Sequence, residues 1–447
     1  MKKSLLLLTV PFLLAGCSLF GGGGSEEDDV NSEAGSKKLT IRFHVNDTSD
    51  EGKGYKKIID AFNAEHAKEG IKVTPAFVAR TGGNDAYDSQ LSRDMLDGTL
   101  PDIITFDAPN CAAYANKGYL YDITDALTSE EKAKFITLNS YQGKLYGIPI
   151  QESSAGFYYN KKIFEIAGID VGGITVENPW NFAQFKDACS KLKASEGAIK
   201  SFYQLDSSRT FTPVDMRLDA TKDETATYLL YPFVYAAGGG FVDETGLTAT
   251  GIFDSANSIK GYQFLKDLVD QGFTSYGVGA TDFFTGATGM YLSSGWTIPD
   301  LDNKFEAIFG KHDRNKWGIL PYPKDSVAAS ATGSWSYAIT NNARKDKTLV
   351  IELLKYITNA TSSKTITDHT GMIPANIDAD VHYDNGSPEF VLRKQLELTG
   401  KERPATIGYP QFSSAFGQVI SEIRSGDVAT IVHNKALVLQ GDLDKLK

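Results

Sequence analysis

The chain has 447 residues, of which 41% are hydrophobic and 11% aromatic, and its formal net charge is −11. A chain of this length can bury more than one hydrophobic core, so we expect two or more domains. The negative charge and the absence of a basic run argue against nucleic acid or an anionic lipid surface as the partner.

The first residues have the pattern of a secretory leader. Two lysines precede an apolar run over 5–14, which is too short to span a membrane comfortably and which ends in the letters LAGC at 14–17. Small residues before a cysteine resemble a bacterial lipobox. We therefore predict a signal peptide over 1–16 and a lipidated Cys17 that anchors the mature protein at the extracellular face of the cell membrane. The alternative is an ordinary secretory leader in which the cysteine is a coincidence.

The segment 17–38 has the composition of a flexible tether. Four glycines at 21–24 are followed by polar and acidic residues at 25–29, and nothing up to residue 38 is apolar enough to begin a core. Such a segment behaves as a flexible coil. A disordered N-terminus without a role has the same composition, so both interpretations stay open.

From residue 39 onward, strand and helix patterns alternate. Period-two hydrophobicity predicts a strand over 39–45, and apolar positions three and four apart predict a helix over 55–62. A second strand over 71–78, a second helix over 87–95 and a buried strand over 101–107, which ends in an acid, follow. This βαβαβ order predicts a parallel sheet whose ligand lies beyond the carboxyl ends of the strands.

The same alternation continues along the chain. A hairpin or strand is predicted over 143–150, another strand over 156–160, and amphipathic helices over 259–269 and 349–357. The sequence therefore predicts an α/β fold from residue 39 to the C-terminus.

Two cysteines remain after Cys17, which are too few for a disulfide scaffold. Cys189 lies on an apolar stripe of a predicted helix and is expected to be a buried thiol; a bridge to Cys111 cannot be tested from sequence.

Catalytic and metal-binding patterns are weak. The six histidines are widely spaced, and no zinc, phosphate-loop or nucleophile-elbow motif occurs. The acidic stretch 378–385 lacks the glycine and the terminal glutamate of a calcium-binding EF-hand loop, so a solvated loop is favoured. We expect no metal and no cofactor. The paired carboxylates of a glycan hydrolase cannot be recognised from spacing, because their geometry is set in three dimensions.

Seven segments, in chain order, resemble one family, the extracellular solute-binding proteins of ATP-driven (ABC) sugar importers, a maltose-binding-like group. They include a Pro-Asp-hydrophobic strand, a Gly-Ile-Pro sequence before the predicted crossover between lobes, and a block that ends in two glycines. The seven segments are 39–62, 96–122, 144–162, 231–239, 289–296, 317–323 and 333–340.

The resemblance implies a periplasmic-binding-protein-like α/β fold, in which two α/β lobes joined by hinge strands hold the ligand in the cleft between them. It places lobe one at 39–151 plus 335–383 and lobe two at 152–334 plus 384–447. It also implies a monomer without enzymatic activity that captures a carbohydrate, in particular an oligosaccharide, by closing its lobes. The carbohydrate would then pass to an ABC permease in the membrane.

Sugar sites combine aromatic rings, which pack on the apolar faces of a pyranose, with amides, carboxylates or arginines that bind its hydroxyl groups. The family's aspartate–arginine pair is absent beside Pro109, and Arg80 is the candidate cation instead. The resemblance implies these ligand-binding residues: Asn46, Arg80, Asp107 and Asn110 in lobe one, Glu152 and Ser153 at the hinge, Tyr228, Tyr231 and Trp296 in lobe two, and Trp335 on the returning hinge segment.

Three alternatives stay open. A surface-anchored glycan hydrolase would release a product, whereas a binding protein would not. A binding protein for a non-sugar solute, such as a polyamine, an iron chelate or glycerol phosphate, would differ in the charge of its cleft. A sensory or adhesive lipoprotein with the same fold cannot be separated from a transport protein by sequence.

Overall fold

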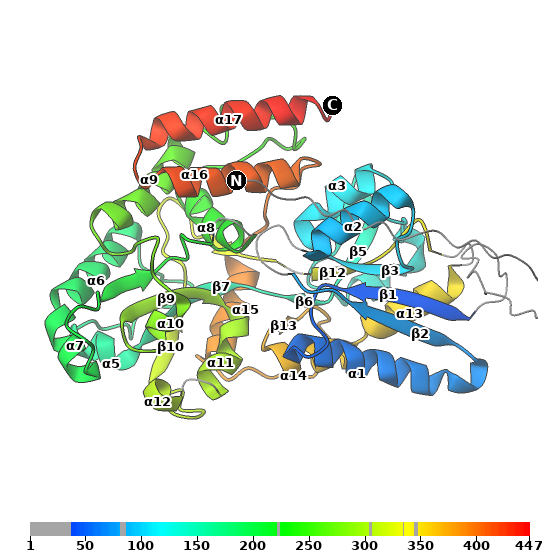
Figure 1. Ribbon diagram of the computed structural model, residues 1–447, viewed down its shortest axis with the longest axis horizontal. Helices are drawn as coiled ribbons and strands as arrows, with labels where there is room; N and C mark the ends of the chain where they lie inside the picture. The colour runs from blue at the N-terminus through cyan, green and yellow to red at the C-terminus, as the bar shows by residue number, and fades with distance from the viewer. Residues whose placement is uncertain (1–36, 81–85, 221–223, 304–305, 334, 344–346) are drawn as a thin grey trace, which may run out of the picture. The chain divides into compact units, whose positions relative to one another are not determined.

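The computed structural model describes residues 37–80, 86–220, 224–303, 306–333, 335–343 and 347–447. The predicted signal peptide, the predicted lipidation site Cys17 and most of the predicted tether lie outside these ranges. Within them, two β-sheets with helices on both faces form the body of the protein (Figure 1).

The strands are β1 (Lys38–Phe43), β2 (Lys72–Phe77), β3 (Ile103–Asp107), β4 (Asn139–Tyr141), β5 (Lys144–Pro149), β6 (Gln151–Glu152), β7 (Ala155–Asn160), β8 (Thr212–Asp215), β9 (Thr288–Ser294), β10 (Trp317–Leu320), β11 (Ser330–Ala331), β12 (Trp335–Ile339), β13 (Ile373–Pro374) and β14 (Gly400–Lys401).

The α-helices are α1 (Asp50–Glu65), α2 (Ala86–Asp97), α3 (Cys111–Asn116), α4 (Ser129–Lys132), α5 (Lys161–Ile166), α6 (Phe182–Ala194), α7 (Glu196–Tyr203), α8 (Glu224–Ala236), α9 (Ala256–Asp270), α10 (Ala280–Phe283), α11 (Ile298–Asn303), α12 (Glu306–Phe309), α13 (Thr348–Ile357), α14 (Ala360–Thr370), α15 (Pro388–Leu398), α16 (Tyr409–Glu422) and α17 (Val428–Asp444). Short 3₁₀ helices are η1 (Ala67–Glu69), η2 (Ala108–Asn110), η3 (Thr124–Ala126) and η4 (Gly295–Thr297).

The first sheet has the strand order β2-β1-β3-β12-β5-β4, and we call it, with its helices, the first lobe. Strand β1 pairs in parallel with both β2 and β3, so the predicted βαβαβ unit is confirmed. The range 143–150, predicted as a hairpin or a strand, contains the single strand β5, which pairs antiparallel with the preceding β4. Strand β12 inserts antiparallel between β3 and β5, although it lies almost two hundred residues further along the chain.

Both faces of the first sheet are covered by helices (Figure 1). On β3, Ile103 belongs to the core cluster that contains the buried residues of α1 and α13, whereas Ile104 belongs to the cluster of α2. Neighbouring side chains of a strand point to opposite faces, so the two clusters lie on opposite sides of the sheet. Helix α1 contains the predicted helix over 55–62 and begins earlier, at Asp50, where Ser49 accepts a hydrogen bond from the Gly52 backbone.

The second sheet has the order β10-β7-β9-β8, and with its helices it forms the second lobe. All six residues of β7 are buried, because Phe157 packs against the cluster of α6, α8 and α9 while Tyr158 packs on the other face with α11 and α12. Helix α9 approaches α8 closely at Gly261, where a Cβ atom would lie 2.6 Å from the Val234 Cα. Glycine at this position therefore permits the packing of the two helices.

Short segments join the two lobes. After β5 the chain passes through β6, which pairs with β13, and then enters β7 of the second sheet. On the return, Gly333 bridges Ser153 just before the chain enters β12. The two crossings therefore lie side by side at Ser153, as hinge segments do in a two-lobed protein.

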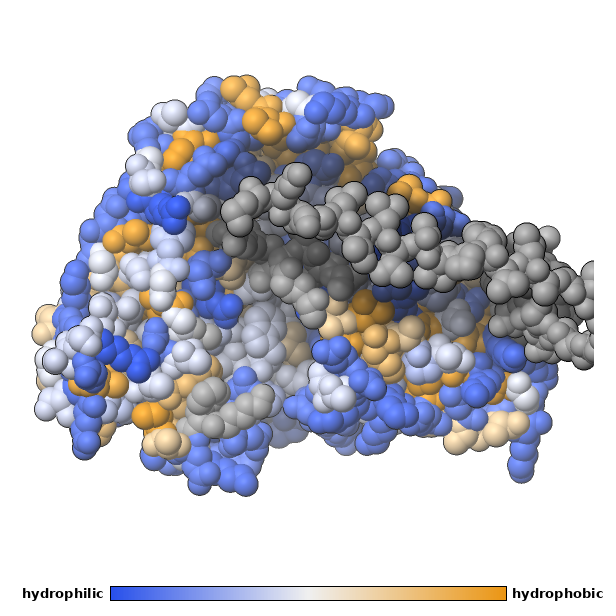
Figure 2. Space-filling view, in the orientation of Figure 1, coloured by the Kyte–Doolittle hydropathy of each residue, from blue (hydrophilic) through white to orange (hydrophobic). Residues whose placement is uncertain are grey.

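Both described cysteines are free and buried, and they lie in different core clusters: Cys189 on α6 in the second lobe, as predicted, and Cys111 on α3 in the first. Leu437 and Val438 of α17 are exposed. Hydrophobic surface is visible along the upper edge of Figure 2, where α17 lies. Across the described ranges, no helix is both long and apolar enough to span a bilayer.

Candidate functional site

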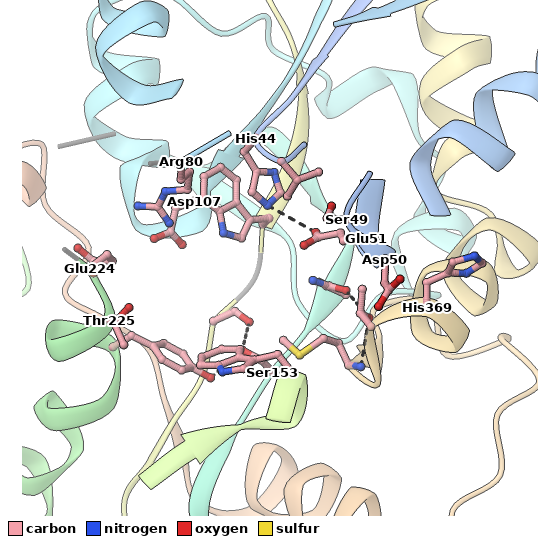
Figure 3. Close-up of a pocket in the computed structure, with 18 of the residues that line it drawn as sticks. His44, Ser49, Asp50, Glu51, Arg80, Asp107, Ser153, Glu224, Thr225 and His369 are labelled. Carbon is pink, nitrogen blue, oxygen red and sulfur yellow. Dashed lines mark hydrogen bonds and ion pairs between the residues drawn. The ribbon is translucent and has the colours of Figure 1, made fainter. Parts of the chain in front are cut away.

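A cavity of about 560 Å³ lies between the two lobes, beside the hinge. Its wall comes from the segments after β1 and β2, the start of α1, the last residue of β3 and the hinge residues. The start of α8, η4, the end of α14 and Arg403 complete it. Sites for small molecules typically occupy about 300 to 1,000 Å³, so this cavity has the size of a ligand site. In Figure 3, His44, Ser49 and Glu51 lie across it from Ser153 and Thr225.

On the first-lobe side, three side chains form a stack. The rings of His44 and Trp335 are parallel, with centroids 3.5 Å apart, and the Arg80 guanidinium carbon lies 4.9 Å from the centroid of the Trp335 ring. Burial, together with the charge of Arg80, lowers the pKa of His44 well below its usual value. The imidazole is therefore neutral at physiological pH, and it lies 3.5 Å from Glu51.

Glu51, in the first turn of α1, is a partly buried carboxyl. Burial raises its pKa, although a hydrogen bond from Tyr55 at 2.6 Å acts in the opposite direction. A carboxyl with a raised pKa is more readily protonated, and it can then donate as well as accept a hydrogen bond. This part of the wall therefore suits ligands with hydroxyl groups.

An ion pair joins the lobes at the bottom of the cavity. Both terminal nitrogens of Arg403 donate to Asp107, at 2.8 and 2.6 Å, and one of them also donates to Glu224 at 2.7 Å. Asp107 ends β3 of the first lobe, and Glu224 begins α8 of the second. The side chain of Arg403 is only 4% exposed, so it connects the two lobes without contact with bulk water.

The environment of Arg403 favours its charge. Burial alone would lower its pKa, but Asp107, Tyr409 and Glu224 outweigh that effect and raise the pKa well above its usual value. Tyr409 and Ser413 both donate hydrogen bonds to Glu224, so both oxygens of the Glu224 carboxylate have partners. Arg403, Asp107 and Glu224 therefore form a hydrogen-bonded ion triad.

On the second-lobe side, Trp296 of η4 is 41% exposed and lines the cavity. Its ring centroid lies 5.7 Å from that of Tyr228, and the Tyr228 hydroxyl is 2.7 Å from the Ser153 hydroxyl. The Ser153 hydroxyl donates to the Gly333 carbonyl at 2.7 Å. The hinge therefore holds Tyr228 in place, and Tyr228 supports an aromatic ring that faces the cavity.

The structure brings seven of the ten predicted ligand-binding residues to this cavity: Asn46, Arg80, Asp107, Ser153, Tyr228, Trp296 and Trp335. Three others do not line it. Asn110 lies at the end of η2, beyond Asp107. Glu152 lines a second cavity instead. Tyr231 is fully buried one helical turn after Tyr228, where its hydroxyl accepts from the Thr332 backbone at 2.9 Å and donates to the Lys401 carbonyl.

Sequence reasoning missed several residues of the cavity wall. Arg403 supplies the cation beside Asp107, but it lies in a loop 296 residues further along the chain, and no motif marks it. Glu224 carries no signal other than its place at a helix start. The others missed are His44, Val45, Ser49, Asp50, Glu51, Ala79, Gln151, Thr225, Pro299, Asp300, Gly333, His369, Thr370 and Met372.

No group of three or more histidines, cysteines and acids that could hold a metal occurs among the residues that the structure describes. The groups that line the cavity are instead aromatic rings, hydroxyls, amides and paired charges.

Two α/β lobes that enclose a cavity beside a double hinge define a periplasmic-binding-protein-like fold, in which the ligand lies between the lobes. This chain belongs to the family of bacterial extracellular solute-binding proteins, whose family model matches residues 46–364. The predicted fold class and the predicted family are thus confirmed.

Individual relatives are distant. A putative binding protein of Brucella abortus (strain 2308) is 23% identical over 431 residues, which cover 93% of each chain. The cyclic α-maltosyl-1,6-maltose binding protein of Arthrobacter globiformis is 18% identical, with a TM-score of 0.73 over 91% of this chain and 99% of that one. UgpB of Mycobacterium tuberculosis, solved in complex with glycerophosphocholine, is also 18% identical, with a TM-score of 0.71 over 92% and 100%. These structures share the fold of this chain.

Proposed function

We propose that this protein captures a carbohydrate, an oligosaccharide, in the cavity between its lobes and delivers it to an ABC permease in the membrane. The observation that carries the proposal is the exposed ring of Trp296, which faces the cavity opposite polar side chains of the first lobe. A pyranose has apolar C–H faces and a rim of hydroxyl groups, so it needs such a combination of an aromatic surface and polar partners.

The charges of the cavity support a ligand without a negative charge. Five acids line it, Asp50, Glu51, Asp107, Glu224 and Asp300, whereas the arginines are Arg80 and Arg403. Arg403 is already bonded to two carboxylates. A phosphate group would therefore meet more negative than positive side chains, which favours a neutral saccharide over a phosphodiester such as the one bound by UgpB.

Membership of a solute-binding family and the similarity to a cyclic-maltosyl-maltose binding protein also support a carbohydrate ligand. We propose that the lobes follow the predicted boundaries, 39–151 plus 335–383 and 152–334 plus 384–447, and that closing them on the ligand presents one shape to the permease. A lipid on Cys17 would keep this monomeric protein at the extracellular face of the membrane, close to that permease. The protein itself performs no chemistry in this proposal.

A thermal-shift screen tests the proposal. Neutral mono- and oligosaccharides should include at least one that raises the unfolding midpoint, because a ligand that binds only the native state stabilises it. Glycerophosphocholine and spermidine, tested in parallel, should give no shift. Chromatography of the saccharide after incubation should show it unchanged. A shift with glycerophosphocholine alone would favour the non-sugar alternative, and released shorter saccharides would favour a hydrolase.

A further inference from the structure

Arg403 is held in place by the second lobe. It follows β14, which pairs with β11, and it precedes Tyr409, which belongs to the core cluster of α6, α8 and α9. One of its terminal nitrogens donates to Glu224 at 2.7 Å and lies 3.4 Å from the Tyr409 hydroxyl. The guanidinium carbon also lies 5.5 Å from the centroid of the Tyr228 ring, which is the distance of a cation–π contact. These partners can therefore hold Arg403 independently of the first lobe.

Asp107 is the partner of Arg403 in the first lobe. It ends β3, and its two carboxylate oxygens accept from the two terminal nitrogens of Arg403 at 2.8 and 2.6 Å. Bidentate pairs of this kind are among the strongest and most directional polar contacts in proteins. Of the hydrogen-bond partners of Arg403, only Asp107 belongs to the first lobe. A movement of the lobes therefore makes or breaks this one pair.

The hinge passes directly beside the pair. A Cβ atom on the hinge residue Gly333 would lie 3.1 Å from a terminal nitrogen of Arg403 and 2.9 Å from the Tyr228 ring, so a side chain here would push against both. Strand β12 begins two residues later, where Trp335 pairs with Asp107. Glycine at this position lets Arg403 reach Asp107 past the hinge. A rotation about the hinge that parts the lobes would carry Asp107 away from Arg403.

Water hardly reaches the pair in this arrangement. The side chains of Arg403 and Asp107 are 4% and 8% exposed. Attraction between charges is stronger at such low exposure than in water, and salt screens it less. The desolvation of charges on burial opposes this gain, but Arg403 is already surrounded by its second-lobe partners, so the further desolvation on closing falls mainly on Asp107.

We propose that the Asp107–Arg403 pair is a latch that holds the two lobes together, so that the closed arrangement predominates before a ligand enters the cavity between them. Entry of a ligand then requires the pair to break, and the rate of this opening limits how fast the protein can load. The inference concerns the regulation of the proposed site. Its loading test rests on the proposed function, whereas its first test needs no ligand.

Small-angle scattering of the protein without added ligand is the first test. Asp107→Asn replaces one carboxylate oxygen with an amide NH₂ group, which cannot accept from the guanidinium, so the bidentate pair is lost with little change in shape. The ratio of closed to open molecules should fall about tenfold or more, and the radius of gyration should rise. The wild-type radius should not change up to about 1 M salt, because a buried pair is screened little.

Glu224→Gln is the matched control. It makes the same change to the other carboxylate bonded to Arg403, but this contact lies within the second lobe, so the radius of gyration should stay at the wild-type value. Arg403→Lys is a second test variant, which keeps the charge. A lysine ammonium lacks the fork that binds both oxygens of one carboxylate, so this variant should also expand. Circular dichroism of each variant checks that it is folded.

The rate of saccharide binding gives a second readout. In stopped-flow fluorescence with the saccharide that gives the largest thermal shift, the observed rate for the wild type should level off at high saccharide concentration, at the rate of opening. Asp107→Asn should raise this plateau about tenfold or more, since the latch no longer has to break. Loss of a direct contact between Asp107 and the sugar would instead raise the dissociation rate and leave the plateau unchanged.

Three results would overturn the inference. Equal radii of gyration for the wild type and Asp107→Asn without ligand would mean that the pair does not hold the lobes together. A wild-type radius that falls when saccharide is added would mean that the ligand closes them. Equal expansion of Asp107→Asn and Glu224→Gln would mean that the contact between the lobes has no special part. Each of these leaves the proposed function standing; if no saccharide binds, the proposed function fails, and the scattering comparison still decides the latch.

Discussion

Replacing Arg403 by methionine is expected to lower the free energy of unfolding by about 3 to 5 kcal/mol, because removal of one partner leaves a buried charge without compensation. Asp107 and Glu224 both lose their cation, and each side chain is at least 85% buried. The two carboxylates would then face each other across the space that the guanidinium leaves. Methionine has a similar length, so the loss of charge, rather than a cavity, dominates the effect.

Urea-induced unfolding, followed by tryptophan fluorescence and by circular dichroism, measures this change. Arg393→Met is the matched control, because Arg393 forms an ion pair with Glu397, four residues further along α15. Exposed pairs of this kind contribute about 1 kcal/mol or less. A triple variant, Arg403→Met with Asp107→Asn and Glu224→Gln, should recover part of the loss, since no unpaired charge remains.

The comparison of Arg403→Met with Arg393→Met can also contradict the account. If Arg403→Met and Arg393→Met lower the stability equally, the buried triad contributes no more than a surface pair. The lobes would then not depend on Arg403 for their connection, and its place at the bottom of the cavity would need another explanation.

Replacing Trp296 by alanine is expected to weaken saccharide binding about 10- to 100-fold, which corresponds to about 1 to 3 kcal/mol. The indole is exposed in the cavity, so a sugar ring that packs on it buries a large apolar area on both partners. Trp335 offers a sugar ring less surface than Trp296 does, because the Trp335 ring already contacts His44 and Arg80.

Calorimetric titration with the saccharide that gives the largest thermal shift measures this loss. Phe202→Ala is the control, because Phe202 is an aromatic residue with a similar exposure, 53%, that does not line the cavity. It should leave the affinity within about twofold of the wild type, as expected for surface positions outside a binding site. An equal affinity of Trp296→Ala and the wild type would remove Trp296 from the site and withdraw the main support for a carbohydrate ligand.

Single helices and strands could be predicted because their hydrophobic residues recur at a regular spacing in the sequence. The alternating residues of β1, the helical stripe of α1 and the acid that ends β3 are all visible within about fifteen residues of sequence. Hydrophobic period reports which face of an element is buried. It does not show the element against which that face packs. The family resemblance assigned 335–383 to lobe one, but the insertion of β12 between β3 and β5 was not predicted.

Some residues of the site could likewise be predicted from the sequence, and others could not. Asp107 and Asn46 could be predicted because they follow strands whose carboxyl ends meet at one edge of the first sheet. Arg403 could not, since its pairing with Asp107 depends on how a loop of the second lobe meets the first. Tyr228 and Tyr231 are three residues apart on α8 and look alike in sequence, but only Tyr228 lines the cavity, whereas the Tyr231 hydroxyl is bonded to the backbone of Thr332 and Lys401.

The most direct test of the proposed function is a crystal structure of the protein with the saccharide that gives the largest thermal shift. We expect one sugar ring to lie flat against Trp296, with its hydroxyl groups within hydrogen-bond distance of Asp107 or Asn46, between the two lobes. A saccharide bound outside the cavity, or a cavity that stays empty at saturating saccharide, would contradict the central claim that this cavity is a carbohydrate-binding site.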